Sequence, residues 1–205
     1  NNRSVIVSAP TGVGKTLVAD YLVEYARSRG QKVIYTAPIK ALSNQKYKEF
    51  KARFGEEHVG VVTGDVSINP RGDVLIMTTE IFRNMVLAQE PFLSEISHCI
   101  FDEIHYIDSE RGVAWEESII FAPLHIRILG LSATIGNLYD LVGWLSEVRQ
   151  EDFAVVVEEQ RTVPLSHYFV WGDERGKAQV AECAQGLMPV LPPVSRAGHL
   201  ELVEQ

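Results

Sequence analysis

Cysteine is scarce in this sequence, whose 205 residues include only Cys99 and Cys183. Two cysteines so far apart exclude a disulfide framework and a cysteine-based zinc site. They favour a reducing environment, and we expect a cytoplasmic, intracellular protein. Long apolar runs are also missing, because none approaches the ~20 residues that cross a bilayer, and no signal peptide opens the chain. We therefore expect no membrane partner.

Basic charge is in deficit, with 19 lysines and arginines against 27 aspartates and glutamates and a formal net charge of −8. The chain as a whole thus lacks the basic footprint of a typical nucleic-acid-binding protein. Net charge governs long-range attraction, however, and it does not exclude a local groove lined by backbone amides and a few lysines. The first residue is Asn1 rather than methionine, and we interpret the chain as a piece of a longer protein.

Short apolar runs alternate with longer amphipathic stretches along most of the chain. The runs predict buried strands, and the stretches predict helices. This order is typical of an α/β fold with a mostly parallel sheet and helices on both faces, whose ligand binds beyond the carboxyl ends of the strands. The predicted strands are 4–8, 32–36, 59–63, 74–78, 98–102, 127–132, 154–158 and 165–170, and the predicted helices are 16–29, 39–54, 80–88, 115–121 and 138–148.

The sequence changes character after residue 170. Residues 172–205 contain Met-Pro-Val-Leu-Pro-Pro and few periodic signals, which favours a tail or a linker. A short stretch, 177–187, is expected to be helical.

A glycine-rich segment follows the first predicted strand and leads into a helix. It ends in Gly14-Lys15-Thr16, as a phosphate-binding P-loop does, with Ala9 where the strict pattern has glycine. Gly12 and Gly14 supply dihedrals that let successive N–H groups point at phosphate oxygens, and the helix offers its positive amino end. Lys15 would reach the β- and γ-phosphates, and the Thr16 hydroxyl would bind Mg²⁺. The predicted nucleotide-binding residues are Pro10, Thr11, Gly12, Val13, Gly14, Lys15 and Thr16.

A second signal, which is acidic, lies at the end of the strand predicted at 98–102. Asp102, at the carboxyl end of a buried strand in a P-loop protein, is the usual second anchor for Mg²⁺. Glu103 is placed to orient and activate the attacking water, and His105 would link the nucleotide site to other moving parts. Asp-Glu-x-His alone also fits a solvated loop, but the upstream P-loop favours the catalytic interpretation.

Together these motifs resemble those of superfamily-two helicases. Asp102-Glu103-Ile104-His105 is similar to the DExH box, the P-loop to motif I, and Ser132-Ala133-Thr134 to motif III. The sequence between them is similar to one branch, the DEVH-box RNA helicases of the superkiller and exosome-cofactor type, although isoleucine replaces the usual valine. The resemblance covers roughly residues 4–170 and is carried further by segments 37–46, 63–65, 68–70, 78–81, 110–117 and 161–168.

The resemblance implies a RecA-like, ATP-binding first motor domain over residues 1–170 and a tail, a linker or the start of an insertion over 171–205. Such helicases clamp Mg-ATP between two RecA-like domains, so a second domain of the same polypeptide is an expected partner. Nothing after residue 170 resembles its motifs. The residues implied in hydrolysis and its coupling to the domain interface are Lys15, Asp102, Glu103, His105, Ser132 and Thr134.

The resemblance also implies a single-stranded nucleic acid as a partner, RNA for this branch. Small hydroxyls and exposed amides suit phosphates and sugars without reading bases. Simpler interpretations exist: Lys40 fits an exposed helix lysine, Thr78 fits a helix cap, and Ser132 and Thr134 fit a strand-end turn. The implied nucleic-acid contacts are Pro38, Lys40, Thr63, Gly64, Thr78 and Thr79.

The leading hypothesis is an ATP-dependent RNA helicase that couples Mg-ATP hydrolysis to single-strand translocation and duplex unwinding. A DNA helicase or translocase of the same superfamily would carry the same motifs, because the sugar preference depends on contacts to the 2′-hydroxyl. A nucleotide-binding scaffold without motor activity is disfavoured, because it has no need of all four of Lys15, Thr16, Asp102 and Glu103. A small-molecule kinase leaves Thr78-Thr79-Glu80 and Ser132-Ala133-Thr134 without a role.

Overall fold

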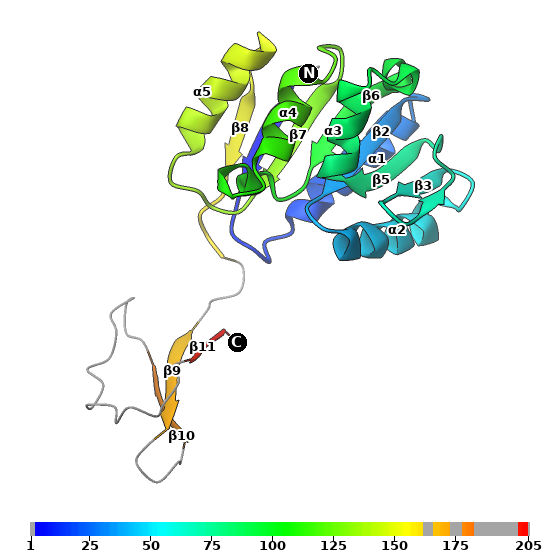
Figure 1. The fold of residues 1–205 in the computed structure, drawn as a ribbon. Helices are drawn as coiled ribbons and strands as arrows, with labels where there is room; N and C mark the ends of the chain where they lie inside the picture. Colours follow the sequence, from blue (N-terminus) through cyan, green and yellow to red (C-terminus); the bar gives the residue numbers. More distant parts are fainter. Residues whose placement is uncertain (1–2, 162–165, 173–177, 183–200, 205) are drawn as a thin grey trace. The chain divides into compact units, whose positions relative to one another are not determined.

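The strands of the computed structural model form one large sheet in the order β4-β3-β5-β2-β6-β7-β1-β8 (Figure 1). All neighbours in it pair in parallel except β3 and β4, which are antiparallel. The structure describes residues 3–161, 166–172, 178–182 and 201–204. The strands are β1 (Val5–Ser8), β2 (Lys32–Ala37), β3 (Val59–Val62), β4 (Ser67–Ile68), β5 (Val74–Thr78), β6 (Ile96–Phe101), β7 (Arg127–Ser132) and β8 (Ala154–Val157).

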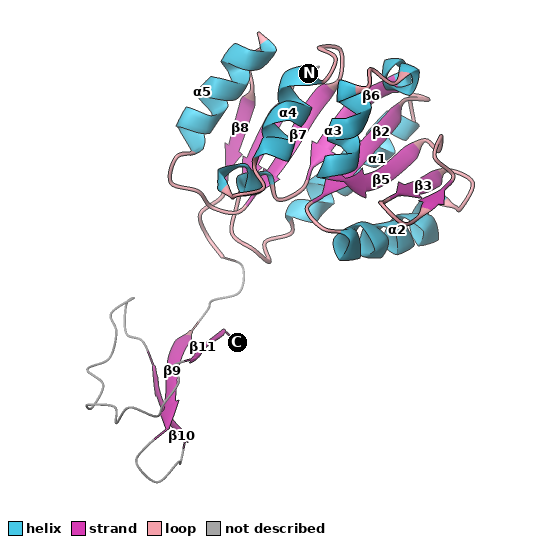
Figure 2. Cartoon of the chain, viewed as in Figure 1, coloured by secondary structure: helices cyan, strands magenta, loops and turns pink. Residues whose placement is uncertain are grey.

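Helices cover both faces of this sheet, as the ribbon coloured by secondary structure makes plain (Figure 2). One apolar cluster lies on each face of the sheet. One contains side chains of α1 (Lys15–Arg27) and α2 (Lys40–Phe54), and the other contains side chains of α3, α4 and α5. The sequence-based α/β fold class is therefore confirmed. The remaining helical elements are α3 (Thr79–Leu87), η1 (Pro91–Glu95), η2 (Ile104–Asp108), α4 (Val113–Phe121) and α5 (Leu138–Arg149).

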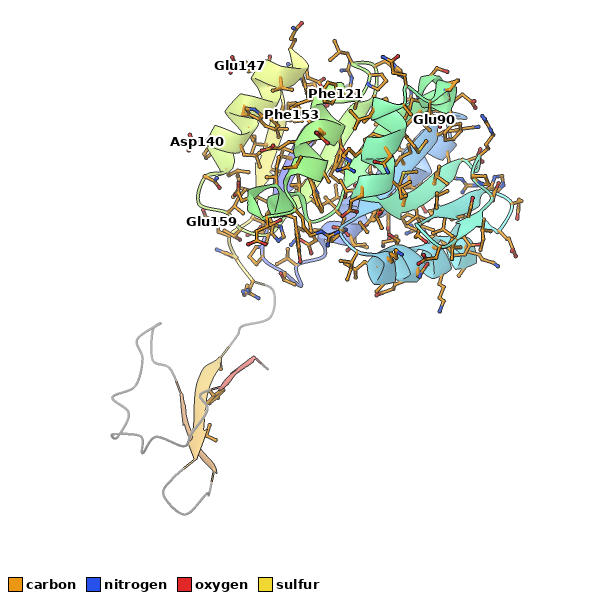
Figure 3. All side chains as sticks on the ribbon, in the orientation of Figure 1. Glu90, Phe121, Asp140, Glu147, Phe153 and Glu159 are labelled. Atoms are coloured by element: carbon orange, nitrogen blue, oxygen red, sulfur yellow. The ribbon has the colours of Figure 1, made fainter. Side chains whose placement is uncertain are left out.

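The last helix of this unit illustrates why the amphipathic stretches become helices. Leu141 and Leu145 of α5 are buried in the cluster shared with α3 and α4, whereas Asp140 and Glu147 are exposed on its outer side (Figure 3). Leucines four residues apart share one face of a helix, so burying that face stabilises the helix against the sheet.

A second compact unit, Thr162–Gln205, follows the first unit, Asn1–Arg161. It contains an antiparallel sheet in the order β10-β9-β11, formed by β9 (His167–Gly172), β10 (Ala178–Glu182) and β11 (Glu201–Glu204). The division after Arg161 lies before the predicted domain boundary at 170, and the assignment of 1–170 and 171–205 stays a prediction.

The prediction of a helix at 177–187 is wrong for the part of that stretch that the structure describes. Residues 178–182 form β10, whose backbone pairs with β9 in the register Val180 to Val170. Cross-strand pairing here outweighs a weak local helical preference. The remainder of that stretch, residues 163–165 and Cys183 lie outside the described residues. Among the described residues, no helix has the length and apolar character needed to cross a membrane.

Candidate nucleotide and nucleic-acid site

The P-loop connects the carboxyl end of β1 to the first residue of α1. Gly12 has φ 89° and Gly14 has φ 91°, a left-handed conformation that glycine adopts without steric cost. Gly14 is the N-cap of α1, whose first turn holds no acidic residue. The amino end of α1 therefore faces the loop without a side-chain cap or an acidic residue to offset its positive dipole, which is the arrangement that binds phosphate.

Lys15 lies across this loop. Its ammonium donates hydrogen bonds to the carbonyl oxygens of Ala9 at 2.7 Å and Pro10 at 3.1 Å. These are neutral acceptors, and phosphate oxygens are stronger ones because both partners would then be charged. The side chain is half-buried, and its role in binding phosphate stays a prediction.

Thr16 and Asp102 line one cavity of about 160 Å³. Asp102 directly follows β6, and Thr16 lies in the first turn of α1. The cavity thus joins the two oxygen donors that were predicted separately for Mg²⁺. Among the described residues, no group of three or more His, Cys, Asp or Glu is arranged to hold a metal. A set of one carboxylate and one hydroxyl fits Mg²⁺, which usually takes one or two carboxylates together with substrate phosphates and water.

Glu103 occupies a left-handed backbone conformation, with φ 52°. Burial raises the pKa of its carboxyl above the usual glutamate value, and the neighbouring charge of Asp102 raises that pKa further, while His105 and Lys15 oppose the shift. Burial and a nearby like charge both disfavour the ionised form. The result is a more basic carboxylate close to the P-loop lysine, which suits a group that orients or deprotonates water.

His105 connects η2 to the segment after β7. The backbone N–H of Ala133 donates to its Nδ1 at 3.3 Å, and the Glu103 carboxylate lies 3.4 Å from the same nitrogen. The two contacts compete, because the first needs an unprotonated Nδ1 and the second a protonated one. The backbone N–H of Ala133 can only donate, so the contact with it places the ring proton on Nε2. His105 thereby joins the DExH box to motif III.

Motif III also contacts the P-loop strand. The Ala9 N–H donates to the carbonyl of Ser132 at 3.1 Å, and the Ser8 hydroxyl donates to the carbonyl of Ala133 at 3.3 Å. The Ser132 side chain is buried, and its hydroxyl has no hydrogen-bond partner among the described residues. Thr134 is exposed. Of the two predicted coupling hydroxyls, only that of Thr134 is open to solvent.

The predicted nucleic-acid contacts follow three adjacent strands, β2, β5 and β3, so they gather at the same edge of the sheet. Their exposure differs. Lys40 is 53% exposed and binds Asp65 at 2.5 Å, Gly64 is exposed, and Thr79 is fully buried. Thr78 is the N-cap of α3 but makes no side-chain cap bond. The buried members of the set are Pro38, Thr63, Thr78 and Thr79, so Lys40 and Gly64 are the two members open to a ligand in this structure.

Several residues at the site were not predicted from the sequence. The Tyr35 hydroxyl donates to Asp102, and burial together with the charge of Asp102 raises the pKa of this phenol, so it stays protonated. Arg111, after the DExH box, forms an ion pair with Glu80 of α3. A tyrosine directly after Val33 and Ile34 in a buried strand was the one available signal for the Tyr35 contact. The sequence carries no signal for the ion pair between Arg111 and Glu80.

Residues 1–141 match the DEAD/DEAH box helicase family, and the chain belongs to this family. It is 48% identical over 169 residues to the DExH-box ATP-dependent RNA helicase DExH9 of Arabidopsis thaliana, covering 82% of this chain and 17% of that protein. It is 47% identical over 169 residues to the exosome RNA helicase MTR4 of Homo sapiens, covering 82% of this chain and 16% of that one. The predicted resemblance is therefore confirmed, and the chain spans less than a fifth of these relatives.

The fold is also similar to that of a solved helicase. The helicase domain of Pyrococcus furiosus Hef superposes with a TM-score of 0.61 at 23% identity, over 78% of this chain and 36% of that one. At this identity the likeness concerns the fold alone, which is RecA-like, as predicted.

Proposed function

We propose that this chain is the ATP-binding motor domain of an RNA helicase, which couples hydrolysis of Mg-ATP to movement along a single strand and to duplex unwinding. The observation that carries the proposal is the meeting of Thr16 and Asp102 in one cavity, with Lys15 and Glu103 beside them. Two motifs separated by more than eighty residues thus supply the phosphate-binding and acidic halves of one site.

Each half has a distinct task in hydrolysis. Backbone amides of the P-loop and Lys15 would hold the phosphates, while Thr16 and Asp102 would hold Mg²⁺. The ion would neutralise charge that develops on the β- and γ-phosphates. Glu103 would orient the attacking water and accept its proton, a role that a partly buried carboxylate with a raised pKa supports.

Coupling to nucleic acid would run through contacts between the motifs. His105 touches motif III through Ala133, and Arg111 pairs with Glu80 in the helix that follows Thr78 and Thr79. Lys40, Gly64 and the backbone around Thr78 would contact phosphates and sugars at the neighbouring strand ends. RNA is the proposed strand, since the relatives with similar sequences bear the name RNA helicase.

A second RecA-like domain of the longer polypeptide would complete the site. An arginine finger contributes about 10³- to 10⁵-fold in rate where it has been measured. We therefore expect the 205 residues alone to bind Mg-ATP weakly and to hydrolyse it poorly. Robust turnover stimulated by RNA with these residues alone would contradict this expectation.

The test is ATP turnover by this chain joined to its native downstream sequence, with matched single-stranded RNA or DNA added. Stimulation by RNA that exceeds stimulation by DNA supports the proposal. Equal or greater stimulation by DNA would reassign the motor to DNA, and no turnover with either would favour a nucleotide-binding scaffold.

A further inference from the structure

Tyr35 places a phenol inside an apolar strand. It follows Val33 and Ile34 in β2, and its side chain is 1% exposed. A buried phenol hydroxyl needs a hydrogen-bond partner. The hydroxyl has its partner directly after the neighbouring strand β6, where it donates to Oδ2 of Asp102 at 2.5 Å.

The two oxygens of Asp102 each accept one hydrogen bond. Oδ2 accepts from Tyr35, and Oδ1 accepts from the backbone N–H of Glu103 at 3.1 Å. Among the described residues, Tyr35 is the one side chain that hydrogen-bonds this carboxylate. Two donors on different elements fix the rotation of the carboxylate, and each oxygen keeps a further lone pair for another ligand.

The Tyr35 ring is itself held in place by α2. Phe50 meets it edge-on, with ring centroids 5.7 Å apart and an interplanar angle of 90°. The Lys46 ammonium lies 5.6 Å from the ring centroid. Lys46 is only 8% exposed and binds Glu49 at 2.9 Å. The hydroxyl therefore cannot swing away from Asp102 without disturbing a packed cluster.

Three of these residues also line the cavity that contains Thr16 and Asp102. Besides Thr16 and Asp102, its lining includes Tyr35, Lys46 and Glu49. The phenol thus lies on the inner wall of the cavity and restrains one of the two oxygen donors, while the other donor belongs to the P-loop helix.

We propose that Tyr35 is a positioning residue for the metal, whose hydroxyl holds Asp102 in the orientation that binds Mg²⁺ together with Thr16. The inference rests on the proposed function, because it takes Asp102 to be a metal anchor. Groups that hydrogen-bond metal ligands from behind orient those ligands and tune their affinity. A purely structural hydroxyl would affect folding stability and leave the magnesium dependence unchanged.

The experiment uses Tyr35→Phe in the full 205-residue chain, which keeps the ring against Phe50 and Lys46. Binding of a fluorescent ADP analogue is measured across a series of free Mg²⁺ concentrations and in excess EDTA. We expect the half-saturating Mg²⁺ concentration to rise by about 10-fold, in the range found when such partners of metal ligands are removed. Binding in EDTA should stay within twofold of wild type (on the order of experimental scatter).

Two matched variants sharpen the result. Tyr139→Phe removes a hydroxyl from α5 that is 73% exposed, and it should leave the magnesium dependence unchanged. In an Asp102→Asn background, Tyr35→Phe should have no further effect on that dependence, because a residue that acts through Asp102 loses its target there.

The outcomes separate the inference from the proposed function. If wild type responds to Mg²⁺ and Tyr35→Phe responds identically, Tyr35 has no positioning role although the site stands. Equal losses of binding in EDTA and in Mg²⁺ would also overturn the inference, because the hydroxyl would then support the fold as a whole. If wild type shows no Mg²⁺-dependent binding, the proposed function itself fails.

Discussion

Glu103 combines two unfavourable features at one residue. Its φ of 52° is a left-handed conformation that costs a non-glycine residue about 1–3 kcal/mol. Its carboxyl is partly buried next to another carboxylate, which raises its pKa. Such features persist where the surrounding structure imposes them, and they cluster at functional sites. Both follow from the position directly after Asp102, where the chain turns sharply into η2.

Glu103→Gln should separate binding from chemistry. Glutamine has nearly the same shape but cannot accept a proton, so we expect turnover to fall by about 10²- to 10⁴-fold, the usual contribution of a general base. Nucleotide affinity should stay close to wild type. Single-turnover hydrolysis and fluorescent nucleotide binding, both on the chain joined to its downstream sequence, measure the two quantities. Wild-type turnover in this variant would remove Glu103 from the mechanism.

At the scale of elements, a buried arginine joins α4 to α5. Arg149 is 2% exposed, and its guanidinium donates to the carbonyls of Ala122 at 2.5 Å, Ile126 at 2.8 Å and Pro123 at 3.1 Å. Ala122 is the C-cap of α4, and Pro123 and Ile126 lie between α4 and β7, so Arg149 of α5 ties the end of α4 to the segment that follows it. The planar guanidinium of arginine carries five N–H donors in a fixed arrangement and can bind several carbonyls at once.

Arg149→Met should destabilise the first unit markedly. Methionine fills a similar volume but removes the guanidinium donors from these carbonyls, and we expect the free energy of unfolding to fall by about 2–4 kcal/mol. Urea unfolding followed by circular dichroism measures the change. Arg29→Met is the control: Arg29 is exposed, so the change should stay within about 0.5 kcal/mol. Equal effects of the two variants would contradict this account.

Two glycines that look alike in the sequence have different surroundings. A Cβ on Gly112 would lie 1.9 Å from the backbone carbonyl oxygen of Ile107, whereas a Cβ on Gly143 would meet nothing within 4 Å. Gly112 lets the loop after the DExH box pack closely before α4 begins. Gly143 lies within α5 and has no such role.

Gly112→Ala and Gly143→Ala should therefore change stability in opposite directions. We expect Gly112→Ala to lower the free energy of unfolding by about 1–3 kcal/mol, the usual cost of overpacking. Gly143→Ala should raise it by about 0.5–1 kcal/mol, the gain of alanine over glycine within a helix. Thermal and urea unfolding of both variants test the pair, and a gain in stability for Gly112→Ala would contradict the packing argument.

Across the whole molecule, the sequence predicted the sheet well because most of its strands are buried and read as continuous apolar runs, as in β5 and β7. The two-residue strand β4 went unpredicted, since Ser67 and Ile68 pair only with β3 and carry no periodic signal. The predicted helix at 177–187 failed at β10 because a weak helical pattern cannot reveal a partner strand.

The candidate site was predictable where chemistry depends on residues close in sequence. The P-loop and the acidic pair have fixed spacings, so the positions of Lys15 and Asp102 were expected. Contacts between distant residues were not: Tyr35 reaches Asp102 across 67 positions, and Arg111 reaches Glu80 across 31. The burial of single residues was equally unpredictable, since nothing in the neighbouring sequence distinguishes the buried Thr79 from an exposed helix-capping threonine.

The central claim is that nucleotide phosphates bind at the carboxyl ends of β1 and β6, where the P-loop and Asp102 lie. The most direct test is the affinity of the full 205-residue chain for fluorescent ADP with Mg²⁺, compared with that of Lys15→Ala. We predict a loss of about 10- to 100-fold, as expected when a charge-assisted contact to phosphate is removed. Lys48→Ala, on the exposed side of α2, should bind as wild type does. Unchanged affinity in Lys15→Ala would contradict the claim and place the nucleotide elsewhere.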